Sequence, residues 1–163
     1  MDGPGMTGQA QREKRASDTV RQTRDMVAMM NPLLGAAEFV FCATNDAGLA
    51  AKAQASSLGW FNEGEGTSLI LERSVAEALG FAADLPMRRI ELTVNSALDG
   101  VGLTAAVSGA LAAEAIPCNV VAAFHHDHIF VPSGMAERAL AVLKALQGGA
   151  VSAMTGLFSS SRT

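Results

Sequence analysis

The pattern of apolar and polar positions in residues 89–133 predicts a strand, a helix and two further strands. Residues 90–95 alternate weakly and carry β-branched side chains, as strands do. A turn containing glycines follows, and the next apolar residues recur at the spacing of one buried helix face: Leu103, Val107, Ala110 and Leu111. Beyond Pro117, the apolar runs 119–124 and 129–131 predict two strands joined by a polar turn. This order is typical of a two-layer α/β sandwich.

The first half of the chain predicts a similar series of elements. Residues 38–44 predict a strong strand, and Asn45 or Asp46 is expected to cap a short alanine-rich helix that ends near Ser57. A hairpin of two strands, a short helix and a linker follow, over residues 60–62, 67–71, 74–80 and 81–88. Both halves therefore begin with a strand that turns into a helix.

Two further helices are expected, one at each end of this region. The first begins at Val20 and ends at Asn31-Pro32, with one face formed by Met26, Met29, Met30 and Leu33. The second is capped by Ser133 and ended by Gly148-Gly149, and its inward side chains are Ala136, Ala139, Leu140 and Leu143.

The two halves repeat each other in the order of their elements. Asp46-Ala-Gly-Leu49 occupies the place in the first half that residues 99–103 occupy in the second. Each half is a βαββα module, too small to bury its sheet well alone. The expected organisation is an N-terminal tail over 1–19, a first module with its leading helix over 20–86, a second module over 87–147 and a C-terminal tail over 148–163. A ligand is expected at the interface between the two similar helix starts.

Composition and charge exclude several functions. With 163 residues, 49% of them hydrophobic and 5% aromatic, the chain is able to bury an aliphatic core. The formal charge of −4 provides no basic surface for nucleic acid. Cys42 and Cys118 show neither CxxC spacing nor a disulfide pattern, which favours a cytoplasmic location. Residues 101–124 are interrupted by polar side chains and by Pro117, so no membrane span is expected, and the first residues lack an apolar signal segment.

Several segments resemble the ACT-domain family. The turn Asp99-Gly-Val-Gly-Leu103, the alanine-rich helix and Ile116-Pro-Cys-Asn-Val-Val121 are similar to the family signature of an acidic residue, a Gly-Leu helix start and a following strand. Residues 102–132 more closely resemble small bacterial tandem-ACT proteins, whose second module ends in a similar NVVA…HDH-I-FVP segment. Residues 30–41 and 63–67 are similar to the first module of those proteins.

The resemblance implies two tandem ferredoxin-like βαββα(β) modules, an α/β (α+β) sandwich with antiparallel sheets packed on helices. It also implies a small effector, usually an amino acid, bound at a module interface near the strand-to-helix turn. The positions that match this site are Asn95, Ser96, Asp99, Gly100, Val101, Gly102, Leu103 and Asn119. The turn lacks the proline of the family pattern D-x-P-G-x-L, so individual effector contacts do not transfer atom by atom.

The turn before the second-half helix has the chemistry to bind a zwitterion. A helix N-terminus leaves backbone N–H groups unpaired and carries a partial positive charge. Gly100 and Gly102 would let a carboxylate approach these donors, and Asp99 would accept a hydrogen bond from an ammonium group. The alternative is that Ser96 or Asp99 only caps the helix, while the glycines relieve crowding.

The turn His125-His126-Asp127-His128 contains all three histidines of the chain. Imidazole and carboxylate groups are zinc ligands, so a metal-dependent enzyme is one alternative function. A two-residue turn at 126–127 would pair His125 with His128 on one face and leave a third ligand missing. A polar turn is therefore favoured, and no metal or other cofactor is expected. His126 is also a candidate side chain of the effector pocket.

The sequence as a whole predicts a regulatory protein without catalysis of its own. It contains no Ser-His-Asp arrangement, phosphate-binding loop or dinucleotide fingerprint. Effector binding would act by population shift and would control an unidentified enzyme. Exposed sheet edges predict a homodimer. A protein-interaction module without a ligand is a further alternative. Arg88-Arg89 is either a surface pair or a contact for an anionic ligand or partner.

Overall fold

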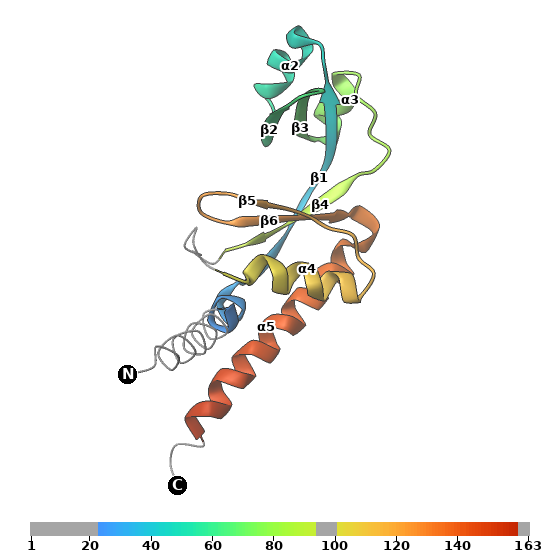
Figure 1. Cartoon of the computed structure of the whole chain (residues 1–163). Helices are drawn as coiled ribbons and strands as arrows, with labels where there is room; N and C mark the ends of the chain where they lie inside the picture. The colour runs from blue at the N-terminus through green and yellow to red at the C-terminus, as the bar shows by residue number, and fades with distance from the viewer. Residues whose placement is uncertain (1–22, 94–100, 160–163) are drawn as a thin grey trace, which may run out of the picture.

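The computed structural model describes residues 23–93 and 101–159, and its centre is one antiparallel sheet of six strands (Figure 1). The strands lie in the order β2-β3-β1-β4-β6-β5. Their bounds are β1 Pro32–Thr44, β2 Gly59–Glu63, β3 Gly66–Glu72, β4 Met87–Leu92, β5 Asn119–Ala122 and β6 Asp127–Pro132. The helices are the leading helix (residues 23–29), α2 Ala47–Gln54, α3 Arg73–Ala78, α4 Leu103–Ala113, the short η1 Ser133–Met135 and α5 Ala136–Ser159.

Two modules of the predicted order share the two central strands. β1 pairs with β3 through Phe39–Thr44, and with β4 through Pro32–Leu34 and Glu38–Phe39. The register shifts between Leu34 and Glu38, and this irregularity lets one long strand serve both modules. β4 therefore completes the sheet of the first module, and the beginning of β1 completes the sheet of the second.

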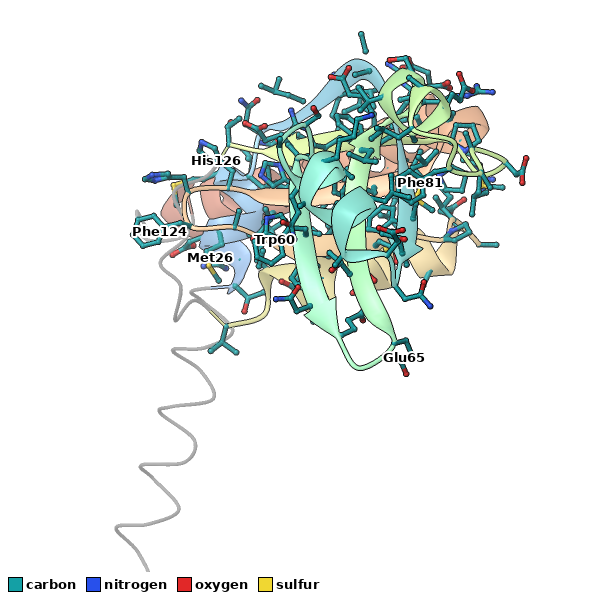
Figure 2. The ribbon with its side chains drawn as sticks, turned by 90° about the horizontal axis from the view of Figure 1, so that it is seen from above. Met26, Trp60, Glu65, Phe81, Phe124 and His126 are labelled. Atoms are coloured by element: carbon teal, nitrogen blue, oxygen red, sulfur yellow. The ribbon has the colours of Figure 1, made fainter. Side chains whose placement is uncertain are left out.

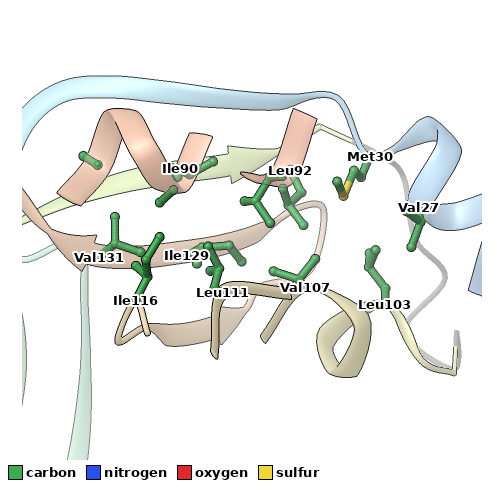
Figure 3. Packing of buried hydrophobic residues seen from close by; sticks show 13 residues of the cluster. Val27, Met30, Ile90, Leu92, Leu103, Val107, Leu111, Ile116, Ile129 and Val131 are labelled. Carbon is green, nitrogen blue, oxygen red and sulfur yellow. The ribbon is translucent and has the colours of Figure 1, made fainter. Parts of the chain in front are cut away.

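The second module has the larger helix-covered core (Figure 3). α4 contributes Leu103, Val107 and Leu111, which are at most 3% exposed, so three residues of the predicted face are confirmed, whereas Ala110 is only half-buried. The leading helix and the residue after it add Val27 and Met30. The other buried members are Ile90, Leu92, Ile116, Ile129, Val131, Ala136, Ala139 and Leu143. The leading helix, which the sequence assigns to the first module, thus packs in the core of the second.

The first module has a thinner core on the same face of the sheet. Its buried members are Val40, Ala53, Leu69, Leu71 and Ala76. Its helices α2 and α3 have eight and six residues, whereas α4 and α5 have 11 and 24. Short helices that contribute alanine to the core remove less apolar surface from water, so the first module gains less stability from burial.

A third apolar cluster lies on the other face of the sheet, which we name the open face because the helices cover the opposite one. Successive strand residues alternate between the faces, and the cluster consists of Phe39, Ile70, Met87 and Phe130. The Phe130 ring is fully buried and meets the rings of Phe39 and Phe41 edge to face, at centroid distances of 5.7 and 5.2 Å. Because Phe130 comes from β6 and its partners come from β1, these contacts join the two modules.

Several strand boundaries differ from the sequence prediction. β1 begins at Pro32, ahead of the predicted start at residue 38, because its first residues pair with β4. β4 begins at Met87, within the segment predicted as a linker, because Met87 and Arg88 pair with β1 on one side and with β6 on the other. Pairing on both sides outweighs a weak local pattern. β5 ends at Ala122, whereas Phe124 lies in the following loop and is 73% exposed.

Three helix boundaries differ as well. Ser133, predicted as a helix cap, begins the short η1, whose N-cap is Pro132, and no side chain caps it. The leading helix ends before residue 30, Met29 is 59% exposed, and Leu33 lies in β1 with 52% of its surface exposed, so the predicted helix face does not form as a unit. Gly148 and Gly149 do not end α5, which continues to Ser159. A glycine costs about 1 kcal/mol in a helix interior, and earlier turns anchored in the core support the helix through these two residues.

The predicted fold class is confirmed: two α/β modules share one antiparallel sheet with helices on one face. The β2–β3 hairpin also forms as predicted, with Glu63 opposite Gly66. Asp46 is the N-cap of α2, one of the two residues expected there. These local features have strong sequence signals, because a two-residue turn needs glycine and a cap needs a short acceptor side chain.

Candidate functional site

The start of α4, the centre of the predicted site, has a glycine as its N-cap. Gly102 has a φ of 102°, in the left-handed region, and its carbonyl oxygen accepts a hydrogen bond from the N–H of Ala106 at 2.9 Å. The N–H groups of the first helical turn have no partner within the helix. Since glycine has no side chain, the N-cap offers them no acceptor. Leu103, another predicted site residue, is buried in the core instead.

The leading helix covers one side of this turn. Thr23 donates a hydrogen bond from Oγ1 to the carbonyl oxygen of Val101 at 2.7 Å. A Cβ added at Gly102 would collide with Thr23 Oγ1 and lie 2.9 Å from its Cγ2. Glycine is therefore required here by the backbone conformation and by the space available. A ligand at this turn has to approach from a side that Thr23 does not fill.

The corresponding start of α2 is closed by an acidic side chain. The Asp46 carboxylate accepts a hydrogen bond from the N–H of Leu49 at 2.8 Å. Thr44 Oγ1 accepts one from the N–H of Asp46 at 3.1 Å. The α2 start thus carries its own anion, which satisfies one helix donor and complements the helix dipole. The two starts match in sequence position but differ in this chemistry.

The two helix starts lie at opposite ends of the sheet (Figure 1). Strands β1 and β4 are antiparallel, with Pro32 opposite Leu92, the last residue of β4. Thr44, which precedes α2, is at the far end of β1 and pairs with Thr67 of β3. The expected interface between the two helix starts therefore does not form within one chain, and a site combining them would need a second chain.

The remaining predicted site residues are distributed unevenly. Four of them lie outside the described residues: Asn95, Ser96, Asp99 and Gly100. Val101 is 56% exposed and adjoins the Gly102 turn. Asn119 begins β5, pairs with Phe130, and donates a hydrogen bond from Nδ2 to the Met87 sulfur at 3.6 Å. Met87 is the first residue of β4, so Asn119 lies at the end of that strand away from the start of α4.

His126 lies at the other end of the β5–β6 hairpin, on the side where α4 begins. The next residue, Asp127, pairs with Leu92, the end of the strand that leads towards α4. Figures 1 and 2 place the hairpin loop on the same side of the molecule as the leading helix. Val101, Gly102 and His126 therefore share one end of the second module.

The histidine turn is longer than the sequence predicts. Residues 123–126 form the loop, closed by a hydrogen bond from the N–H of Ala123 to the carbonyl oxygen of His126 at 3.2 Å. His128 lies in β6 opposite Val121. The prediction that His125 and His128 form a cross-strand pair is wrong, because a longer turn changes which residues face each other.

A polar group surrounds His128 at this end of the sheet. Its Nδ1 lies 3.7 Å from a carboxylate oxygen of Glu91, which makes an ion pair on protonation but is too long for a hydrogen bond. Nδ1 of His126 is also buried without a hydrogen-bond partner. Burial, reinforced by Arg89, lowers the pKa of His128, and burial raises the pKa of Asp127, which is 8% exposed. Both shifts favour the neutral forms.

The histidines do not assemble a metal centre. In the ranges 23–93 and 101–159, no three His, Cys, Asp or Glu side chains are grouped so that they could hold a metal ion. His128 faces Glu91 within the sheet, whereas His125 packs edge to face on Phe124 at a centroid distance of 4.9 Å. The alternative of a metal-dependent enzyme gains no support from the described residues.

The structure also contains a cavity that the sequence did not indicate. It has a volume of about 370 Å³ and lies at the end of β3. Its lining residues are Phe39, Ser56, Ser57, Leu58, Glu72, Val75 and Arg89. The only sequence signal was the Arg88-Arg89 pair, and strand alternation separates these two side chains onto opposite faces of the sheet.

The relationship to known proteins agrees with this architecture. Two sequence profiles of the ACT domain match the chain, over residues 20–88 and over residues 86–145. The chain belongs to the ACT-domain family. A Vibrio cholerae protein of unknown function, described as a possible transport protein, is 37% identical to this tandem ACT-domain chain; the match covers 77% of this chain and 95% of that one, with a TM-score of 0.68.

Regulatory subunits of aspartate kinase share the tandem ACT fold. For the ligand-free subunit from Thermus thermophilus, identity is 13%, coverage is 73% of this chain and 97% of that one, and the TM-score is 0.55. For the subunit from Thermus flavus, identity is 12%, coverage is 71% of this chain and 95% of that one, and the TM-score is 0.53. No curated protein sequence matches the chain. ACT-domain membership supports a small-molecule-binding regulatory role, and none of the described helices is long and apolar enough to cross a membrane.

Proposed function

We propose that this tandem ACT-domain protein binds an amino acid at the start of α4 and thereby regulates a partner enzyme. The observation that carries the proposal is that the N-cap of α4 is Gly102, whereas the N-cap of α2 is Asp46, whose carboxylate accepts a hydrogen bond from the helix. A ligand carboxylate at α4 would take the role that Asp46 plays at α2.

The rest of the proposed site follows from the sequence and from the residues at this end of the module. Asn95, Ser96, Asp99 and Gly100 precede the turn, and Asp99 is assigned to the ligand ammonium group. Val101 and the backbone at Gly102 and Leu103 border the carboxylate. His126 lies at the same end of the second module. Asn119 fits only a site completed by a second chain, because it lies at the other end of its hairpin.

The proposed mechanism is a population shift through the two central strands. The turn that follows β4 leads to the proposed site, and β4 belongs to the sheets of both modules. A ligand that binds one arrangement of the turn more tightly than another would therefore bias both modules. We further propose a homodimer, since β2 and β5 are edge strands that end the six-stranded sheet on either side.

Calorimetric titration with each of the twenty amino acids tests the function directly. For a ligand at 100 times its Kd, binding stabilises the native state by about 2.7 kcal/mol. For a chain of this size, the midpoint of thermal unfolding should rise by roughly 5–10 °C. If no amino acid produces heat or a melting shift, the proposed effector class is wrong.

Site variants test the position of the ligand. Asp99→Asn should weaken binding of the identified amino acid about tenfold or more, because it removes the charge assigned to the ammonium group. Asp84→Asn makes the same chemical change at an exposed position in a loop of the first module and should leave the Kd unchanged. Equal affinity in both variants would contradict the assignment of Asp99.

A further inference from the structure

We propose that the cavity at the end of β3 is a second binding site, for an amino acid with an apolar side chain. It lies in the first module, whereas the proposed effector turn precedes α4 in the second. The two proposals share a class of ligand but not a site, so either one can fail alone. The cavity has a volume of about 370 Å³, which lies in the range of small-ligand pockets.

Arg89 provides the site with a positive charge that is held in place and that has no hydrogen-bonded acid among the described residues. Its guanidinium carbon lies 5.6 Å from the centroid of the Phe39 ring, a cation–π contact that fixes the group over the open face. The Arg89 side chain is 27% exposed, and its ion pair with Glu91 has an N–O distance of 3.7 Å, too long for a hydrogen bond. A ligand carboxylate can therefore form a bidentate pair with the Arg89 guanidinium.

The adjacent residue, Arg88, has a structural role, which contrasts with that of Arg89. Arg88 donates from Nε to the carbonyl oxygen of Gly35 at 3.1 Å and from a terminal nitrogen to Glu137 at 3.0 Å. These bonds tie β4 to the bulged part of β1 and to α5. The Arg88 guanidinium therefore binds groups of the protein itself, whereas within residues 23–93 and 101–159 Arg89 contacts only Glu91, at a long distance, and the ring of Phe39.

The acidic and hydroxyl groups of the cavity suit an ammonium group. Phe39 of β1 pairs with Glu72 of β3 on one side and with Met87 of β4 on the other. Arg89 comes two residues after Met87, so it lies on the same face as Phe39 and Glu72 and diagonally across from Phe39. Glu72 and Arg89 therefore lie on opposite sides of Phe39. Ser56 and Ser57 line the same cavity. The carboxylate of Glu72 and these hydroxyls provide acceptors for an ammonium group opposite the cation that receives a carboxylate.

The remaining lining residues select the side chain of the ligand. Phe39, Leu58 and Val75 provide apolar surface, and Leu58 is 45% exposed. A ligand side chain such as that of leucine or valine would cover this surface and remove it from water, at about 25 cal/mol per Å². The cavity thus combines groups of opposite charge, two hydroxyls and an apolar wall. These groups complement an aliphatic amino acid better than a nucleotide or a sugar.

Titration of the full-length chain with leucine, and with its 2-oxo acid analogue that lacks the ammonium group, tests the proposal. The wild type should bind leucine more tightly than the oxo acid. Arg89→Met keeps a long apolar side chain but removes the charge, so leucine binding should weaken 10- to 100-fold. Glu72→Gln should weaken leucine binding while leaving binding of the oxo acid unchanged. Glu72 is exposed, so this variant tests the site without threatening the fold.

Arg138→Met is the matched control, because Arg138 is exposed and pairs with Glu114 on the helical side of the second module. It should leave both affinities unchanged. If Arg89→Met binds leucine within twofold of the wild type, or if the wild type binds no aliphatic amino acid, the cavity proposal is overturned. Loss of amino-acid binding in Asp99→Asn but not in Arg89→Met would support the α4 site and reject the cavity. The reverse result would reject the α4 site and support the cavity.

Discussion

The two modules have the same order of elements but very different cores. Among the described residues, 13 buried side chains form the helix-covered core of the second module, including two from the leading segment. Five form that of the first, and two of these are alanines. The first module also carries exposed aromatic side chains, with Trp60 46% and Phe61 54% exposed. We therefore expect the second module to be the more stable one. The first module is joined to it through the shared strands β1 and β4.

This difference teaches that a repeated order of elements does not give equal stability. Regions with few buried contacts open at lower free energy than the rest of a protein. The first module is therefore expected to respond more to ligands and to weakened contacts than the second. The cavity lies in the module with the small core, whereas the α4 turn lies in the module with the large core. The following predictions test whether the two modules unfold as one unit.

The largest effect is expected at the contact that joins the modules. Phe130→Ala should lower the free energy of unfolding by about 3–5 kcal/mol, because the ring is fully buried and meets Phe39 and Phe41. Urea unfolding followed by circular dichroism and by Trp60 fluorescence should then give two separate transitions, with Trp60 reporting the earlier one. Coincident transitions would show that the shared strands alone keep the modules together.

A matched pair of leucines compares the two cores directly. Leu111 and Leu71 are both fully buried, in the second and first core respectively. Leu111→Ala should cost about 4–5 kcal/mol, and Leu71→Ala about 2–3 kcal/mol, because a thin core relaxes more easily around a cavity. Urea denaturation of both variants provides the measurement. An equal or larger loss for Leu71→Ala would contradict the idea that the first module is the weaker one.

The contact between the leading helix and the α4 turn should have an intermediate effect. Gly102→Ala should lower stability by about 1–3 kcal/mol, since alanine disfavours a φ of 102° and its Cβ would collide with Thr23. Thr23→Ala alone should cost about 1 kcal/mol for the lost hydrogen bond to Val101. In the double variant the loss should be smaller than the sum, because the collision is gone. Strict additivity in this cycle would argue against close packing at the turn.

The smallest effect is a pH dependence at the end of the hairpin. A lowered pKa of His128 means that its protonation opposes folding: no stability is lost above its ordinary pKa near 6.5, and stability falls as pH drops below it. Burial, Arg89 and His126 lower the pKa of His128. Glu91 and Asp127 favour protonated His128 and offset part of that lowering. His128→Gln should reduce the loss of stability between pH 7.5 and pH 5.5, measured by urea unfolding.

His125→Gln is the control for that measurement, because His125 is exposed in the loop and packs on Phe124. It should keep the wild-type pH dependence. If both variants lose stability on acidification as the wild type does, other groups cause the effect. The raised pKa of Asp127 acts in the opposite direction, since its protonation at lower pH favours the folded state.

Sequence reasoning succeeded where a local rule decides the conformation. The buried face of α4, the β2–β3 turn and the cap at Asp46 each depend on a few neighbouring residues. It failed where partners distant in sequence decide. The early start of β4 at Met87 depends on pairing with β1 and β6, and the pairing of His128 with Val121 depends on a loop longer than the shortest turn.

The candidate site shows the same division. The sequence singled out Gly102, which is the N-cap of α4, whereas the roles of Asp99 and Gly100 stay predictions. The contact of Thr23 with Gly102 and the grouping of Glu72 with Arg89 around Phe39 could not be predicted. Both bring together segments that are far apart along the chain.

The sequence by itself determined the kinds of elements, their order and the ACT-domain family, because periodicity, caps and turns are local properties. Only the tertiary structure decided that the modules share β1 and β4, that the leading helix packs on the second core, and that the two helix starts lie at opposite ends. The physical reason is that strand pairing and core burial are cooperative. They reward contacts between distant residues, and no single segment encodes them.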